Sequence, residues 1–138
     1  MSKNIKAYNS ILDLIGNTPL VKLNNITKDI PGNFYAKVEA LNPGHSNKDR
    51  IALHIIESAE RKGLLKPGST IIETTSGNTG FSLSMVSMIK GYNCILAVSS
   101  KSSSDKIDML KSMGAKVYVC PAHAVSYTHL TLPTRLSV

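Results

Sequence analysis

One lysine, Lys48, has a position that suggests covalent chemistry. It lies in the stretch NPGHSNKDR, residues 42–50, between a strand-like apolar run and a helix-like one. Apolar residues follow it at helical spacing on the same face, at Ala52, Ile55, Ile56 and Ala59. Lys48 is therefore the first residue on the apolar face of a predicted helix, and this face is expected to pack on the core.

The first turn of a helix is an unfavourable place for an ammonium group. Partial burial and the positive end of the helix dipole both favour the neutral amine, which is a nucleophile that forms Schiff bases with carbonyl groups. A capping box between Ser46 and Asp49 would start the helix just ahead of Lys48. The alternative is a lysine whose ammonium group reaches solvent from the helix end.

A second motif, TSGNTG at residues 75–80, follows a predicted strand and opens a predicted helix. Its hydroxyl and amide groups, together with backbone N–H groups freed by Gly77 and Gly80, suit a carboxylate or a phosphate at a helix N-terminus. It lacks the Gly-Lys-Ser/Thr ending of a Walker A loop and the dinucleotide G-x-G-x-x-G pattern. The alternative is an ordinary helix cap with a tight turn.

The remaining pattern alternates strands and helices and predicts an α/β fold. Helices are expected over residues 47–62, 81–90 and 105–113, and strands over 34–41, 70–74, 93–98 and 116–120. Strands separated by helices are parallel, so we predict an open parallel sheet with flanking helices. Both motifs then lie at the carboxyl ends of strands, where such sheets bind ligands.

Composition excludes several other classes. The 138 residues are 42% hydrophobic and 18% charged, as in one globular domain, and no apolar run is long enough to span a membrane. The N-terminus lacks the apolar core of a signal peptide, which predicts a cytoplasmic protein. The net charge of +7 is dispersed, which argues against a nucleic-acid partner. Two separated cysteines and four scattered histidines predict buried free thiols and no metal site.

Three motifs in this order resemble the cysteine synthase and cystathionine β-synthase family. They are GNTPLVKL at 16–23, NPGHSNKDR at 42–50 and ETTSGNTG at 73–80, and the resemblance covers residues 11–123. It implies the tryptophan synthase β-like fold, of which this chain is the small N-terminal domain in truncated form. It also implies pyridoxal 5′-phosphate as cofactor.

The resemblance places the family's cofactor lysine at Lys48, which would also act as the base for the substrate α-proton. It places the asparagine that hydrogen-bonds the cofactor at Asn78. The loop that binds the substrate carboxylate falls on Thr75, Ser76, Gly77, Asn78 and Thr79. The implied reaction is a β-replacement on serine or O-acetylserine, in which a thiol or sulfide adds to give cysteine or cystathionine. The family also implies a homodimer.

Two departures from the family pattern bear on these expectations. Residues 99–103 read SSKSS where the family has a Met-Pro-Glu-type turn, which leaves open whether sulfide or homocysteine is the acceptor. The family's glycine-rich phosphate cup lies far downstream, so we expect the 138-residue chain itself to be inactive.

The expected domain organisation has three parts. Residues 1–33 would pack on the missing larger domain, and residues 34–125 would form the small α/β domain that carries the cofactor lysine. Residues 126–138 resemble a translated sequencing adapter, so we expect a non-native tail; a genuine polar tail is the alternative.

Two competing functions remain at this stage. A threonine dehydratase or threonine synthase would use similar chemistry on a hydroxy amino acid. A non-catalytic amino-acid-binding module would use TSGNTG without any reaction at Lys48.

Overall fold

The computed structural model describes residues 7–75 and 77–122. Two short strands come first, β1 (Leu20–Lys22) and β2 (Tyr35–Lys37), with 3₁₀ turns at Ile11–Leu14 and Glu39–Leu41. The remaining elements are α1 (Lys48–Arg61), β3 (Thr70–Thr74), α2 (Asn78–Lys90), β4 (Asn93–Ser99), α3 (Ser104–Ser112) and β5 (Lys116–Cys120). In the described residues, no helix has the length and apolar character that crossing a membrane requires.

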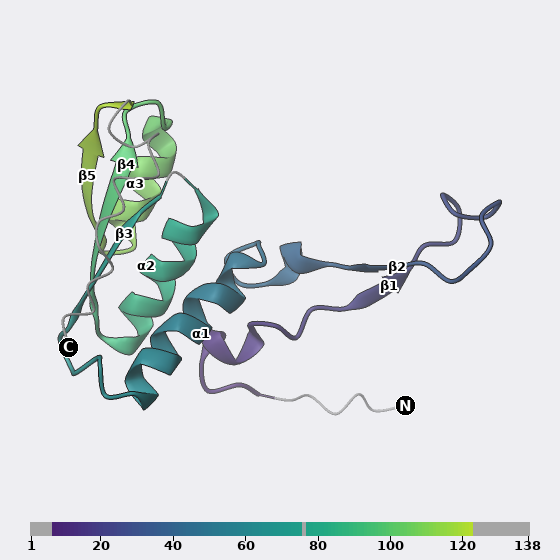
Figure 1. The fold of residues 1–138 in the computed structure, drawn as a ribbon, viewed down its shortest axis with the longest axis horizontal. Helices are drawn as coiled ribbons and strands as arrows, with labels where there is room; N and C mark the ends of the chain where they lie inside the picture. The colour runs from purple at the N-terminus through teal and green to yellow at the C-terminus, as the bar shows by residue number, and fades with distance from the viewer. Residues whose placement is uncertain (1–6, 76, 123–138) are drawn as a thin grey trace.

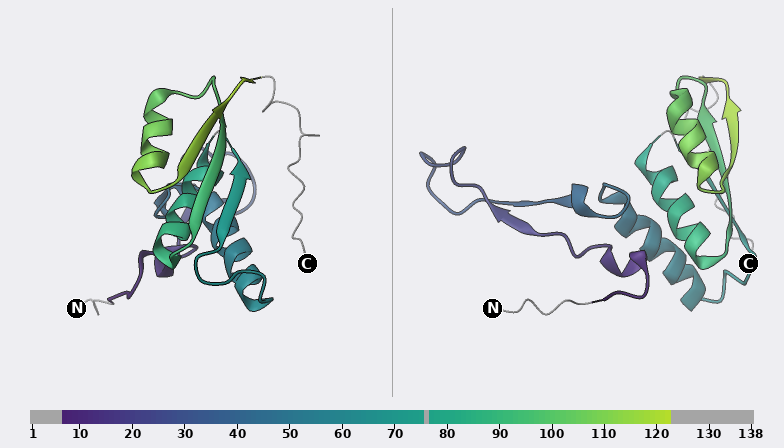
Figure 2. Two further views of the ribbon diagram at one scale, coloured as in Figure 1. Left: turned by 90° about the vertical axis from the view of Figure 1, so that its left-hand side faces the viewer. Right: turned by 180° about the vertical axis from the view of Figure 1, so that it is seen from behind.

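The centre of the fold is a three-stranded parallel sheet in the order β3-β4-β5. Figures 1 and 2 show α2 and α3 against one face of this sheet, with α1 in a further layer outside α2. Helices on one side are what right-handed crossovers produce when the strand order runs in one direction. The predicted α/β class with a parallel sheet is confirmed.

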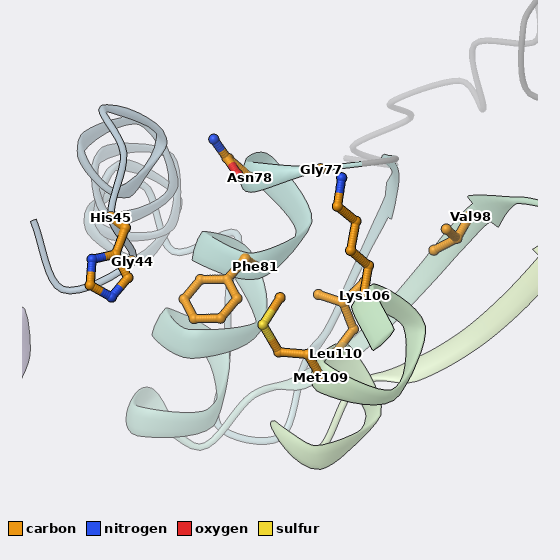
Figure 3. Close-up of a pocket in the computed structure, with 9 residues that line it drawn as sticks. All are labelled: Gly44, His45, Gly77, Asn78, Phe81, Val98, Lys106, Met109 and Leu110. Carbon is orange, nitrogen blue, oxygen red and sulfur yellow. The ribbon is translucent and has the colours of Figure 1, made fainter. Parts of the chain in front are cut away.

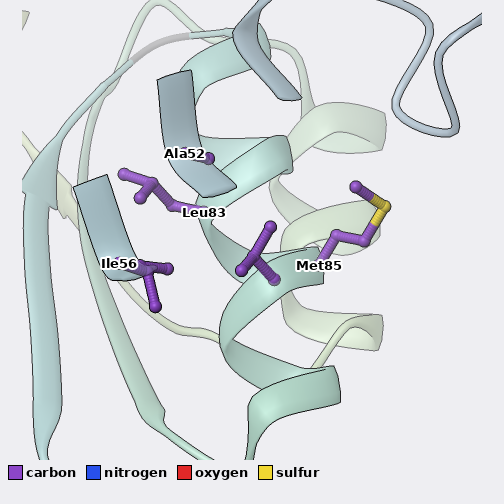
Figure 4. Packing of buried hydrophobic residues seen from close by; sticks show 5 residues of the cluster. Ala52, Ile56, Leu83 and Met85 are labelled. Atoms are coloured by element: carbon purple, nitrogen blue, oxygen red, sulfur yellow. The ribbon is translucent and has the colours of Figure 1, made fainter. Parts of the chain in front are cut away.

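Helix α2 is buried on most of its surface because it lies between the sheet and α1. Toward α1, Leu83 and Val86 pack with Ala52 and Ile56, as Figure 4 shows. Toward the sheet, Cys94, Leu96 and Val98 alternate along β4 as its buried face and pack with Leu110 of α3. This explains why α2 is buried around most of its circumference, with the small serines Ser82, Ser84 and Ser87 among its buried residues, whereas α1 is buried on one face.

Both cysteines are free thiols, as the sequence predicts. Cys94 is buried, and this burial raises the pKa of its thiol. Cys120 is only half-buried, so the prediction of burial holds fully for one of the two.

The predicted strand at 34–41 is wrong in its extent and in its sheet. Only Tyr35–Lys37 is extended, and this strand pairs antiparallel with β1, with Val21 opposite Ala36. The alternation of strands and helices therefore begins at β3, not at residue 34. Figure 1 shows β1, β2 and the loop between them as an arm that projects away from the helices. Ile26 at its far end is 81% exposed.

An ion pair fastens this arm to α1. Arg50 donates from Nε and Nη2 to the two carboxylate oxygens of Glu39, at 2.8 and 2.9 Å, and from Nη2 to the Gly16 carbonyl at 2.9 Å. Thr18 donates to Glu39 at 2.8 Å, and Asn42 joins the Glu39 carboxylate to the Gly16 N–H. Two of the sequence motifs, around residues 16–18 and 42–50, are thus one hydrogen-bonded unit.

The Glu39 carboxylate makes acid stability a test of this unit. Hydrogen bonding to the Arg50 guanidinium lowers the pKa of Glu39 from 4.5 to about 2. Between these values the unfolded state binds the proton and the folded state does not, so stability falls as the pH falls through this range. We expect Glu39→Gln to reduce the loss of stability with falling pH. The measurement is the urea unfolding midpoint from pH 5 to pH 2, a range that roughly spans the two pKa values.

Glu57→Gln is the matched control, because the ion pairs of Glu57 are long, 4.0 Å to Arg61 and 3.8 Å to Lys90, and its side chain is 41% exposed. It should keep the acid dependence of the unmodified chain. Equal flattening in both variants would contradict the assignment to Glu39.

Candidate functional site

A buried carboxylate, Asp49, fixes the loop that precedes α1. Its side chain is fully buried and accepts the Gly44 N–H at 2.5 Å and the Ser82 hydroxyl at 2.5 Å. The predicted capping box is therefore wrong: Ser46 accepts the Lys48 N–H at 3.2 Å, but Asp49 turns inward instead of back to Ser46. The helix nevertheless starts at Lys48, as predicted.

Lys48 is the first residue of α1 and is half-buried. Its amino group makes no hydrogen bond or ion pair within residues 7–75 and 77–122. The buried stripe of α1 is Asp49, Ala52 and Ile56, while Ile55 is 56% exposed. The predicted stripe is thus rotated, and Lys48 lies at its border. Because Asp49 is bonded to Ser82, one turn into α2, the backbone at Lys48 is held beside the start of that helix.

The second motif forms the N-terminus of α2. This helix starts at Asn78, three residues before the predicted start, so Asn78 and Thr79 lie in its first turn and Gly77 is its N-cap. Asn78 is exposed, and Thr79 is half-buried. Among the predicted site residues, Ser76 lies outside the described residues.

The two glycines of this motif have different roles. Open space surrounds Gly77 where a Cβ would be, while its N–H donates to Thr75 Oγ1 at 3.3 Å. Gly80 is buried, and its N–H bonds to the Gly77 carbonyl and to Thr75 Oγ1, at 3.1 Å each. The prediction that Gly80 offers its N–H to an anion is wrong. A Cβ at Gly80 would collide with Thr75 Cγ2 and meet Leu96, so this glycine serves helix-to-sheet packing.

A cavity of about 190 Å³ opens where the two motifs meet. Figure 3 shows its walls: the loop before α1, the start of α2, the end of β4 and one side of α3. The nine lining residues are Gly44, His45, Gly77, Asn78, Phe81, Val98, Lys106, Met109 and Leu110. Lys48 is not among them, although it follows His45 by three positions.

Two of these nine residues, Gly77 and Asn78, were predicted as site residues. The other seven were not, and they include His45, Phe81, Lys106 and Met109. Phe81 and Met109 match ordinary core positions of their helices, and Lys106 matches a solvated one. His45 carried a usable signal, because it follows a Pro-Gly pair in a turn. Its φ of 58° is in the left-handed region, which non-glycine residues seldom adopt.

Comparison with known proteins identifies the relatives of this chain. Residues 11–132 match the model of a family described as pyridoxal-phosphate dependent enzyme. The chain belongs to this family.

The curated relatives of the chain include proteins with two different enzyme names. A cystathionine beta-synthase from Apis mellifera is 54% identical over 86% of this chain and 24% of its own length. A cysteine synthase 1 from Emericella nidulans is 46% identical over 84% of this chain and 31% of its own length. The chain thus spans about a quarter to a third of the curated relatives it matches.

Solved structures share the fold. The structure of an O-ureido-L-serine synthase matches with a TM-score of 0.78 at 42% identity. The match covers 88% of this chain and 38% of the synthase chain. A hydrogen sulfide-producing enzyme from Fusobacterium nucleatum has a TM-score of 0.78 at 43% identity, with 86% and 39% covered. The prediction of the small N-terminal domain of this enzyme fold is confirmed.

The residues present fit the family's cofactor. An unpartnered, half-buried amine at Lys48 is suited to a Schiff base with an aldehyde. The exposed Asn78 amide lies at a helix N-terminus, which favours anionic and oxygen-rich ligands.

Substitutions at two adjacent positions in the loop before α1 should change the free energy of unfolding in opposite directions. At Gly44 a Cβ would approach Asp49 Cγ to 2.9 Å and collide with Oδ1, so Gly44→Ala should lower the free energy of unfolding by about 2 kcal/mol. His45→Gly removes a left-handed histidine and should raise it by about 1 kcal/mol. Urea unfolding of the two variants measures both effects.

His45 also has one weak contact to lose, a 3.3 Å approach of Nδ1 to the Ala40 carbonyl. His45→Ala loses this contact and keeps the strain, so it is the matched control. A stabilised His45→Ala variant would contradict the assignment of the effect to backbone conformation.

Proposed function

We propose that this chain is the cofactor-lysine part of an enzyme that performs β-replacement on serine or O-acetylserine and yields cysteine or cystathionine. The observation that carries the proposal is the bond from Asp49 to Ser82, which holds Lys48 beside the loop that begins α2. The chain covers only part of its relatives, so the proposal concerns a family-length protein that contains it.

Lys48 would hold pyridoxal 5′-phosphate covalently, and Asn78 would hydrogen-bond it. When bound, this cofactor supplies an electron sink that stabilises negative charge at the substrate α-carbon. The amine of Lys48 would also act as the general base for the substrate α-proton. These roles rest on the match of each residue to the family motifs.

The loop formed by Thr75, Ser76, Gly77, Asn78 and Thr79 would bind the substrate carboxylate. Support comes from its position at the N-terminus of α2, where the N–H groups of Asn78 and Thr79 precede the first intrahelical acceptor. Thr75 Oγ1 accepts two backbone N–H groups and so is held in place with its hydroxyl proton available to a ligand. Binding at this loop orients the α-carbon for proton removal.

The partners and organisation follow as part of the same proposal. A thiol or sulfide is the acceptor, and the functional form is a cytoplasmic homodimer. Residues 1–33 would pack on the larger domain, with residues 34–125 as the small domain. Exposed apolar side chains on the arm, including Leu20 and Ile26, support a covering partner. The expected non-native tail, residues 126–138, lies outside the described residues.

Lys48→Ala tests the proposal in a family-length protein that contains this chain. Loss of the attachment point and base should reduce β-replacement by roughly 10²–10⁴-fold or more. Borohydride reduction followed by peptide mass analysis should find cofactor mass on the peptide containing Lys48 in the unmodified protein only.

Lys62→Ala, at the exposed C-terminal end of the same helix, is the control and should keep both activity and labelling. A Lys48→Ala protein that retains its rate would refute the function. Retained amino-acid binding without any reaction in the unmodified protein would instead favour a binding module.

A further inference from the structure

The cavity between α2 and α3 contains a cation that no part of the proposed chemistry uses. This is Lys106, in the first turn of α3. Its ammonium group has no carboxylate partner in residues 7–75 and 77–122, although Lys111 on the same helix pairs with Asp108 at 3.3 Å. None of the nine lining residues is an aspartate or a glutamate. The cavity therefore has an uncompensated positive charge.

The charged and apolar parts of the cavity are separated in space. Figure 3 shows the Lys106 side chain extending toward the end where Gly77 and Asn78 lie, while Phe81 and Met109 project into the middle. Val98 and Leu110 complete the apolar wall. A ligand that fits this arrangement has an anionic group at one end and a short apolar part.

The size of the cavity limits the ligand further. Its volume of about 190 Å³ is below the roughly 300–1,000 Å³ of pockets for drug-sized molecules. A short amino-acid thiol is small enough for this space, and its methylene groups and sulfur suit contact with Phe81 and Met109.

We propose that the cavity is the subsite for the thiol acceptor, and that Lys106 binds the acceptor's carboxylate. This inference rests on the proposed function and deepens it, since it selects an acceptor of the homocysteine type over bare sulfide. Sulfide has neither a carboxylate to pair with Lys106 nor carbon atoms to cover Phe81.

The first substrate does not account for this lysine. Its carboxylate is assigned to residues 75–79, which use backbone N–H groups, hydroxyls and an amide. A second carboxylate at the same end of the cavity needs a further group to pair with it, and Lys106 is the lining residue that has an ammonium group there. The inference concerns binding only, and the thiol is the sole co-reactant it requires.

Binding to the cofactor-free 138-residue chain tests the subsite independently of catalysis. NMR titration with homocysteine should shift the signals of Met109 and Leu110. The methyl ester of homocysteine, which lacks the negative charge, should bind about tenfold more weakly. Lys106→Met should weaken homocysteine binding by about the same factor, because the carboxylate and the Lys106 ammonium group are the two partners of one interaction. The substitution should leave the affinity for the ester unchanged, since the ester lacks the carboxylate.

Two further variants serve as controls. Lys106→Arg keeps the charge and should retain binding within about threefold, a small free-energy change. Lys111→Met removes a cation from the same helix outside the cavity and should have no effect. Equal affinities for homocysteine and its ester, or equal losses in Lys106→Met and Lys111→Met, would overturn the inference.

Steady-state kinetics in a family-length protein give the second readout. Lys106→Met should raise the KM for homocysteine about tenfold and leave kcat and the KM for sulfide unchanged. A uniform loss with both acceptors would overturn the subsite. The β-replacement itself is tested separately by Lys48→Ala, so either proposal can fail while the other stands.

Discussion

The site depends on one buried carboxylate. Asp49 has no exposed surface, and its two oxygens are each committed to one donor, the Gly44 N–H and the Ser82 hydroxyl. A buried charge persists in a fold only when hydrogen bonds or opposite charge compensate its desolvation. Here the compensation comes from a loop and a helix that are separated in sequence by 33 residues, from Asp49 to Ser82. The same bonds that stabilise the charge therefore fix the loop, Lys48 and the start of α2 relative to one another.

Packing around α2 explains how two helix N-termini come to one place. The helix is covered by α1 on one side and by the sheet on the other, with Leu83, Val86 and Leu96 among its buried contacts. Gly80 allows the approach to β4 and to Thr75 because it has no Cβ. The Arg50 and Glu39 pair then ties the arm to the outer layer. The packing of α2, the hydrogen bonds of Asp49 and the Arg50–Glu39 pair together hold these parts of the chain in place.

The geometry, the family match and the acceptor subsite agree in their chemistry. The relatives are named as synthases of cystathionine and cysteine. The loop before α1, the start of α2 and one side of α3 meet at the cavity (Figure 3). An enzyme that joins a small amino acid to a thiol needs its binding groups in such proximity.

The amino-acid sequence by itself determined the regular elements after residue 47 and the identity of the chemical motifs. Glycines at helix ends, such as Gly91 and Gly114, and apolar runs such as residues 70–74 act locally, so their consequences are predictable from nearest neighbours. The tertiary structure alone decided which sheet β2 joins, which way Asp49 turns and what Gly80 is for. It also placed Lys106 and His45 on one cavity. Each of these depends on a partner distant in the chain, and local propensity and spacing have no information about such contacts.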